Sequence, residues 1–102
     1  MDHAPASDIT RRLRCASGHL NSVISMTESS QPCEQILHQL NAVQAALRIA
    51  GIKIIECQAK SSQDIILNSA SVEQRTEELH HLQLLFTIFV KRYSTKSEVN
   101  YE

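Results

Sequence analysis

The stretch that begins at Gln31, QPCEQILHQLNAVQAALRIAGIKIIECQAKSSQD, consists almost entirely of residues that favour the α-helix. It carries two of the three cysteines of the chain, Cys33 and Cys57. Because a helix rises about 1.5 Å per residue, the two thiols would lie roughly 36 Å apart along one helix. They cannot meet within one chain, so a partner for Cys33 must come from elsewhere.

The scarcity of turn residues extends the helical prediction to the whole chain. Only two glycines and two prolines occur in 102 residues, whereas a β-sandwich or barrel needs turn signals about every 8–12 residues. We therefore predict an all-α fold with three helices. Residues 1–6 are expected to form a flexible N-terminal arm, residues 7–93 a three-helix domain, and residues 94–102 a flexible C-terminal tail.

Capping residues predict where the helices begin and end. Ser7 or Asp8 can cap the first helix, which we expect to end at Glu28, in the segment before Pro32. The second helix is expected to begin one or two residues before this proline, which suits the first turn. Ser71 with a glutamine three residues later forms a capping box for the third helix.

The apolar positions of the first helix form one seam, whereas those of the second helix indicate that it is covered from two sides. In the first helix the apolar positions are spaced 4, 3, 4, 3 and 4 residues apart, which is typical of a helix–helix seam. The second helix carries one apolar stripe and, beside it, a stripe of small residues. The predicted seams are Ile9, Leu13, Ala16, Leu20, Val23 and Thr27 in the first helix, and Leu37, Leu40, Val43, Leu47, Ala50, Ile54 and Cys57 in the second.

This excess of apolar surface predicts an oligomer, because a chain of this size buries only about two-thirds of its unfolded surface. The small residues centre on Ala45 and Ala46. If two copies of the second helix pack antiparallel about this centre, residue 33 of one chain lies opposite residue 57 or 58 of the other. Cys33 would then face Cys57 and Gln58 of the partner subunit.

The net charge of −1 gives no bulk attraction to nucleic acid or membrane, so any such binding must come from a local patch. The chain has neither an apolar run long enough for a membrane span nor the basic and apolar start of a signal peptide. We expect a cytoplasmic protein that does not bind membranes, with thiols rather than disulfides. No phosphate loop, nucleophile elbow or paired-carboxylate motif is present, so an enzyme is not expected.

One continuous segment, DITRRLRCASGHLNSVISMTESSQPCEQILHQLNAVQAALRIAGIKII, resembles the CsoR/RcnR/FrmR family of small transcriptional repressors. The matching features are RRLR followed by Gly18, the cysteine after a short polar turn, and the pattern AVxAALRxxGxKxxE. The resemblance covers roughly residues 8–92. It implies an antiparallel dimer of the long second helix, a dimer of dimers, and operator DNA binding without a helix-turn-helix. It also implies release of the DNA by a metal ion, formaldehyde or a sulfur species.

The resemblance places the effector cysteine at Cys33. It also implies a histidine and a further cysteine or histidine where this chain has Gln58 and Ser62, and a nearby carboxylate that corresponds to Glu78. An amide and a hydroxyl compete poorly for copper(I), so a copper(I) sensor of the usual type is not expected. Gln44 stands where the family often has arginine, which removes one expected phosphate contact.

Cys33 and His3 are the candidate effector-binding residues, with Cys57, Gln58 and Ser62 as their neighbours across the dimer. A cysteine at a helix N-terminus suits a thiolate ligand or nucleophile; the alternative is a small interface residue. His3, with the N-terminal amine and two backbone amides, forms a set that suits copper(II) or nickel(II). Nickel, cobalt and copper(II) are thus the candidate metal ions. The alternative for His3 is that it belongs to an N-terminal tail without function. The alternative for Cys57 is plain core packing.

The candidate DNA-binding residues form a basic set in the first two helices. Repeated four times in a tetramer, this set would make a broad positive face that binds phosphate with strong salt dependence. We therefore predict a DNA-binding repressor released by an aldehyde, a thiol-modifying species or a metal ion. The alternative is an oligomeric ligand- or metal-binding protein that has lost DNA binding. The basic set consists of Arg11, Arg12, Arg14, Arg48 and Lys53.

Overall fold

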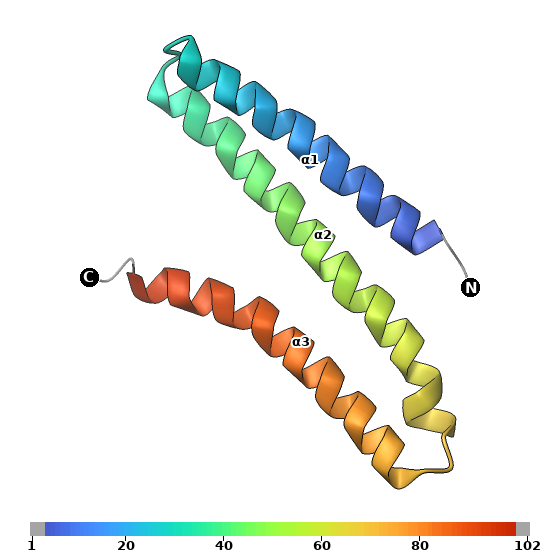
Figure 1. The fold of residues 1–102 in the computed structure, drawn as a ribbon. Helices are drawn as coiled ribbons and strands as arrows, with labels where there is room; N and C mark the ends of the chain where they lie inside the picture. The colour runs from blue at the N-terminus through green and yellow to red at the C-terminus, as the bar shows by residue number, and fades with distance from the viewer. Residues whose placement is uncertain (1–3, 100–102) are drawn as a thin grey trace. The chain divides into compact units, whose positions relative to one another are not determined.

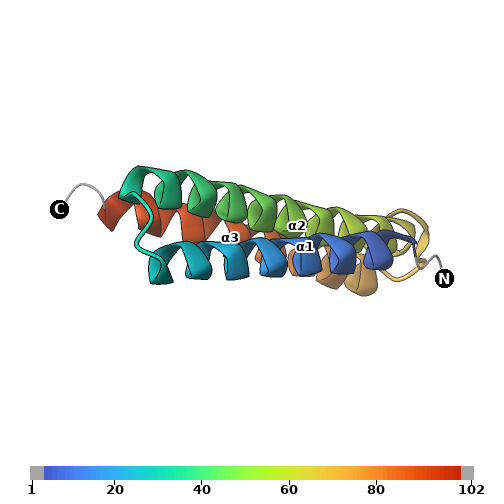
Figure 2. The ribbon, with the colours of Figure 1, turned by 90° about the horizontal axis from the view of Figure 1, so that it is seen from above.

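The computed structural model describes the backbone of residues 4–99 and the side chains of residues 6–91. It contains three helices, α1 (Ala4–Glu28), α2 (Cys33–Asn68) and α3 (Val72–Val99), and no strand in this part of the chain (Figures 1 and 2). The prediction of an all-α fold with three helices is confirmed. The dimer and the dimer of dimers stay predictions.

Two helices are longer than predicted. α1 begins at Ala4 instead of Ser7, because Pro5 lies in the first turn, where its missing N–H needs no partner. α3 continues past residue 93 to Val99, and its sequence contains no glycine or proline that would end it earlier. The division into an arm, a domain and a tail stays a prediction.

The chain forms two compact units, Met1–Ile54 and Ile55–Glu102, which we call the N-terminal unit and the C-terminal unit. In the N-terminal unit, α1 and the first part of α2 run antiparallel, side by side (Figures 1 and 2). The core of this hairpin is small. It consists of four side chains with exposed fractions of 1–5%, spaced seven residues apart in each helix, as in a coiled coil: Ala16 and Val23, and Val43 and Ala50.

The seam of α1 differs from the predicted one. Leu13 and Leu20 are 40% and 41% exposed, so their place in the predicted seam was wrong. Arg12 and His19 are instead half-buried. His19 forms a 2.7 Å hydrogen bond from its Nε2 to Oε1 of Gln39 on α2. A polar side chain that finds such a partner can occupy a seam, which hydropathy alone does not indicate.

The turn between α1 and α2 is a Schellman motif. The N–H of Gln31 donates to the carbonyl of Met26 at 3.0 Å, and the N–H of Ser30 donates to the carbonyl of Thr27 at 3.2 Å. Ser30 has a φ of 57°, in the left-handed region. α1 ends at Glu28 as predicted, but this left-handed residue, not the proline that follows, ends it.

We expect Ser30→Gly to raise the free energy of unfolding by about 0.5–1 kcal/mol, because glycine adopts a positive φ without the steric cost of a Cβ. Urea denaturation at one fixed protein concentration measures this change. Ser29→Gly is the matched control. Ser29 has no positive φ and its Oγ bonds the carbonyl of Ser25 at 3.0 Å, so this variant should lose stability. A loss of stability in Ser30→Gly would contradict the prediction.

In the C-terminal unit, Ser71 caps α3 as predicted. Its Oγ accepts a hydrogen bond of 3.1 Å from the backbone N–H of Gln74. In a capping box the Gln74 side chain would accept a hydrogen bond directly from the N–H of Ser71, but here the hydroxyl of Ser69 lies between them. The N–H of Ser71 donates to Oγ of Ser69 at 3.2 Å, and this hydroxyl donates to Oε1 of Gln74 at 2.6 Å. The turn therefore uses one more residue than the motif in the sequence indicates.

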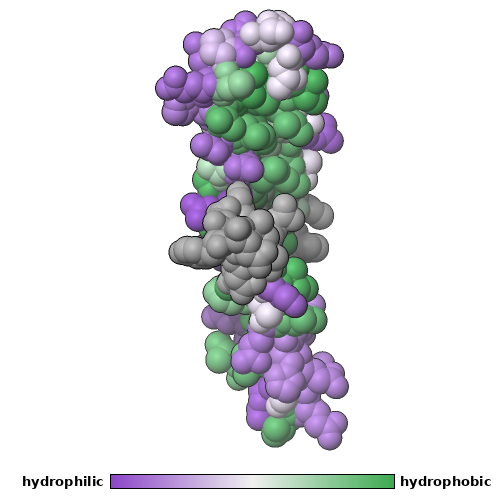
Figure 3. All heavy atoms as spheres, turned by 90° about the vertical axis from the view of Figure 1, so that its left-hand side faces the viewer, coloured by the Kyte–Doolittle hydropathy of each residue, from purple (hydrophilic) through white to green (hydrophobic). Residues whose placement is uncertain are grey.

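Large apolar side chains remain exposed on both helices of the N-terminal unit, by 40–57%. Figure 3 shows hydrophobic side chains gathered on the surface of this hairpin, below the α1–α2 turn at the top of the view. Contiguous apolar surface of this kind marks interaction sites. No helix in the described residues is long and apolar enough to cross a membrane. The exposed side chains are Leu13, Leu20, Ile24, Leu37, Leu47, Ile49, Ile52 and Ile54.

Candidate functional site

Cys33 lies in the first turn of α2, as the sequence predicted, and is its first residue; the helix begins two or three residues later than the predicted start at residue 30 or 31. The carbonyl of Pro32 accepts hydrogen bonds from the N–H groups of Gln35 at 3.0 Å and Ile36 at 3.1 Å, which makes this proline the cap of the helix. The thiol of Cys33 is exposed and forms no disulfide. At this position it lies beside backbone N–H groups that have no partner within the helix. The thiol is therefore accessible to a reagent or a ligand.

Three predicted residues of the C-terminal unit come together in one hydrogen-bonded network. Ser62 is fully buried, and its Oγ donates to Oε1 of Glu78 at 2.5 Å. Nε2 of Gln58 donates to Oγ of Ser62 at 3.0 Å and to the same oxygen of Glu78 at 3.4 Å. The network thus joins α2 to α3, and we call it the Gln58–Ser62–Glu78 network.

The donor set of this network does not fit a soft metal ion. One neutral amide, one hydroxyl and one carboxylate are weak ligands for copper(I) or nickel. The amide and the hydroxyl are already engaged with the carboxylate. Among the described residues, no group of three or more histidine, cysteine, aspartate or glutamate side chains could hold a metal ion. The network therefore does not form a site for such a metal ion.

The other two candidates for the effector site are Cys57 and His3. Cys57 is half-buried and forms no disulfide, and its carbonyl accepts a hydrogen bond of 3.3 Å from Oγ of Ser61. His3 lies outside the described residues, so its role stays a prediction. Cys33 belongs to the N-terminal unit and Cys57 to the C-terminal unit. The predicted contact between them would join two subunits, and it also stays a prediction.

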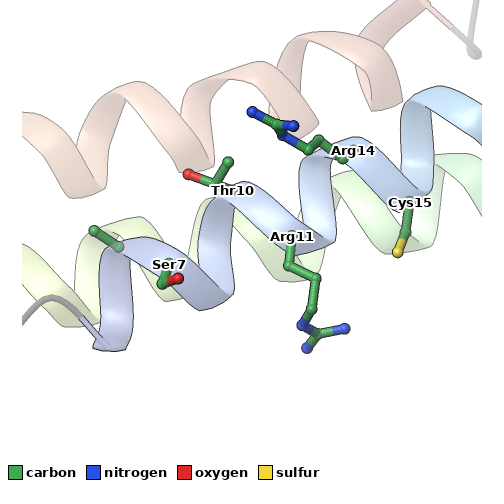
Figure 4. A pocket seen from close by; sticks show the side chains of 6 residues that line it. Ser7, Thr10, Arg11, Arg14 and Cys15 are labelled. Atoms are coloured by element: carbon green, nitrogen blue, oxygen red, sulfur yellow. The ribbon is translucent and has the colours of Figure 1, made fainter.

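The five basic candidates all belong to the N-terminal unit, and none of them is buried. Arg11 and Arg12 are both engaged by one carboxylate: Asp8 accepts a 2.6 Å bond from Arg11 and a 2.9 Å bond from Arg12. Arg14 has no ion-pair partner among the side chains of residues 6–91. Figure 4 shows Arg11 and Cys15 on one side of α1 and Arg14 on the other, so the guanidinium groups spread around the helix.

Asp8 is a residue of this part of α1 whose ion pairs were not predicted from the sequence. Its position three and four residues before two arginines is the helical spacing for ion pairs, and this spacing was visible in the sequence. The hydrogen bond from Arg12, followed by that from Arg11, lowers the pKa of the Asp8 carboxyl, and the Asp8 carboxylate raises the pKa of Arg11. A lowered pKa contributes stability above the ordinary value of 3.8, which is lost as the pH falls through the lower folded value.

An open hollow lies along the first three turns of α1. It is lined by Ala6, Ser7, Thr10, Arg11, Arg14 and Cys15 (Figure 4). Hydroxyl groups and guanidinium groups are side chains that commonly contact phosphate oxygens in protein–DNA complexes. The lining side chains come from a single helix, so the hollow is a feature of the α1 surface.

Comparison with known proteins agrees with the resemblance seen in the sequence. The model of a family described as metal-sensitive transcriptional repressor matches residues 6–87. The copper-sensing transcriptional repressor CsoR of Bacillus subtilis (strain 168) is 32% identical over 79 residues, which cover 78% of each chain. No solved structure matches. The matched family is one of repressors and not of enzymes, and this chain belongs to it: it is a member of the metal-sensitive transcriptional repressor family.

Proposed function

We propose that this protein represses transcription as a homotetramer that binds operator DNA and releases it when an effector acts at Cys33. The observation that carries the proposal is the placement of Arg11, Arg12, Arg14, Arg48 and Lys53. All five lie in one compact unit and none is buried. Cationic side chains of this kind supply most of the sequence-independent affinity for DNA. Such a repressor acts in the cytoplasm.

The proposed assembly begins with an antiparallel pair of α2 helices. The exposed leucine and isoleucine side chains of the N-terminal unit support it, because a second copy would cover them. In such a dimer Cys33 would face Cys57, Gln58 and Ser62 of the partner subunit. Two dimers would then join into the tetramer and present four copies of the basic set to the DNA.

Modification of the Cys33 thiol is the effector chemistry we favour, because one cysteine suffices for it. Formaldehyde adds to a thiol to give a hydroxymethyl thioether. A nearby amine can then displace water to form a methylene bridge. A persulfide could instead oxidise Cys33 and Cys57 of the partner subunit to a disulfide, and would leave as a thiol and hydrogen sulfide. The disulfide requires the two Cα atoms to come within about 7 Å.

The second effector class is a metal ion. Nickel, cobalt or copper(II) would bind Cys33 together with His3 and the N-terminal amine, since the Gln58–Ser62–Glu78 network offers no suitable ligands. The membership of the family supports a metal-sensing role. The chemistry of the network argues against copper(I) at that place in this chain.

A rival function is an oligomeric ligand-binding protein that has lost operator binding. Gln44 and the net charge of −1 support it, because both reduce the attraction to phosphate.

One experiment separates the two functions. Light scattering should give a mass near 46 kDa, four times the 11.5 kDa of one chain. The same sample should retard the promoter fragment beside its own gene, with an affinity that falls steeply as salt rises from about 50 to 200 mM. The triple variant Arg11→Gln, Arg12→Gln and Arg14→Gln should bind more weakly and show a flatter salt dependence. A monomer would exclude the assembly, and a lack of retardation at low salt would favour the rival.

A further inference from the structure

Asp8 occupies the groups that two of the DNA-binding candidates would offer to phosphate. One of its oxygens lies 2.6 Å from a terminal guanidinium nitrogen of Arg11, and the other lies 2.9 Å from Nε of Arg12. The carboxylate thus divides its two oxygens between two arginines. Both arginines come from the same helix as Asp8, so the arrangement forms as soon as α1 forms.

A carboxylate and a phosphate oxygen make the same kind of charge-assisted bond to a guanidinium group. An arginine that donates to Asp8 therefore offers fewer N–H groups and a smaller net charge to DNA. The side chain of Arg11 is 63% exposed and that of Asp8 35% exposed, so a phosphate could approach the pair from solvent. Because the ion pair between Arg11 and Asp8 is exposed, it is weak enough for a phosphate to replace the Asp8 carboxylate.

We propose that Asp8 competes with DNA phosphates for the guanidinium groups of Arg11 and Arg12 and thereby weakens operator binding. The inference rests on the proposed function, since it assumes that α1 faces the DNA. Arg14 has no ion-pair partner among the described side chains, so Asp8 does not occupy its guanidinium group. The affinity of the repressor is then set below the maximum that its basic set allows, which makes release by an effector easier.

The test compares Asp8→Asn with the parent in gel shifts on the promoter fragment at several salt concentrations. Asp8→Asn should bind about threefold to tenfold more tightly, as expected from the loss of one exposed and one half-buried ion pair that compete with DNA. Its salt dependence should also be steeper. Glu28→Gln is the matched control, because it removes one negative charge from the same helix about 30 Å from Asp8, beyond the screening length.

A double-mutant cycle tests whether Asp8 acts through the arginines. In the background of Arg11→Gln and Arg12→Gln, the change Asp8→Asn should have no further effect on affinity. Asp8→Ser provides a second variant if the asparagine form folds poorly, as judged by circular dichroism. Retention on phosphocellulose, measured as the salt concentration at elution, gives a readout that needs no operator.

The outcomes separate this inference from the proposed function. If the parent does not retard the promoter fragment, the proposed function fails, and the elution from phosphocellulose still tests Asp8. Equal or weaker binding by Asp8→Asn, on DNA or on phosphocellulose, overturns the inference. An equal gain in Glu28→Gln also overturns it, because the effect would then come from net charge alone. Tighter binding only in Asp8→Asn, lost in the arginine background, supports it.

Discussion

The Cys33→Ala variant is expected to retain operator binding and to lose its response to every effector. Cys33 is exposed at the first turn of α2 and forms no disulfide, so its replacement removes the reactive sulfur without opening a core cavity. DNA release should be measured with formaldehyde, a persulfide, nickel and copper(II). The parent should release DNA with at least one of them, and the variant should stay bound at the same concentrations.

Matched variants identify the chemistry. Cys15→Ala removes the other exposed thiol of the N-terminal unit and should respond like the parent. Loss of response in Cys57→Ala would indicate a disulfide between subunits, whereas loss in His3→Ala would indicate a metal site or the N-terminal amine. If Cys33→Ala responds like the parent to all four effectors, Cys33 is a packing residue and the sensor hypothesis is wrong.

The Ser62→Ala variant is expected to lower the free energy of unfolding by about 1–3 kcal/mol. Ser62 is fully buried, donates to Glu78 and accepts from Gln58. Its removal deprives a partly buried carboxylate of a donor and leaves the Gln58 amide with only the longer bond to Glu78. Urea denaturation at a fixed protein concentration measures the change.

Ser61→Ala is the control for this substitution. Ser61 is the adjacent residue on α2, but it is exposed and bonds only the carbonyl of Cys57. Its replacement should change the free energy of unfolding by no more than about 0.5 kcal/mol. Equal effects of the two substitutions would mean that the buried network contributes no stability beyond that of an ordinary surface hydroxyl.

The seam of α1 is where the sequence prediction and the structure differ most. Hydropathy placed Leu13 and Leu20 in the helix–helix seam of α1, yet both are exposed within the hairpin, and Arg12 and His19 take the half-buried positions. The apolar spacing was compatible with either choice, because neighbouring helical positions lie on overlapping faces. The hydrogen bond from His19 to Gln39 joins residues far apart in the sequence. No local pattern could indicate it.

In the candidate site, too, local features were predicted from the sequence and contacts between helices were not. The position of Cys33 in the first turn of α2 followed from local capping chemistry and was predicted correctly. Gln58, Ser62 and Glu78 were named as neighbours of the effector site, but the sequence did not indicate that they bind one another. Their network depends on α3 packing against α2, which brings residue 78 beside residues 58 and 62.

The sequence by itself determined the helices, because helix propensity, caps and the lack of glycine and proline act within a few residues of one another. It also indicated the family, through a pattern that extends over most of the chain. The tertiary structure decided which faces of those helices meet, and therefore which polar groups are buried and satisfied. Burial and hydrogen bonding between helices depend on residues distant in the chain, so Ser62 became the buried centre of a network and Leu13 an exposed surface residue only when the helices packed.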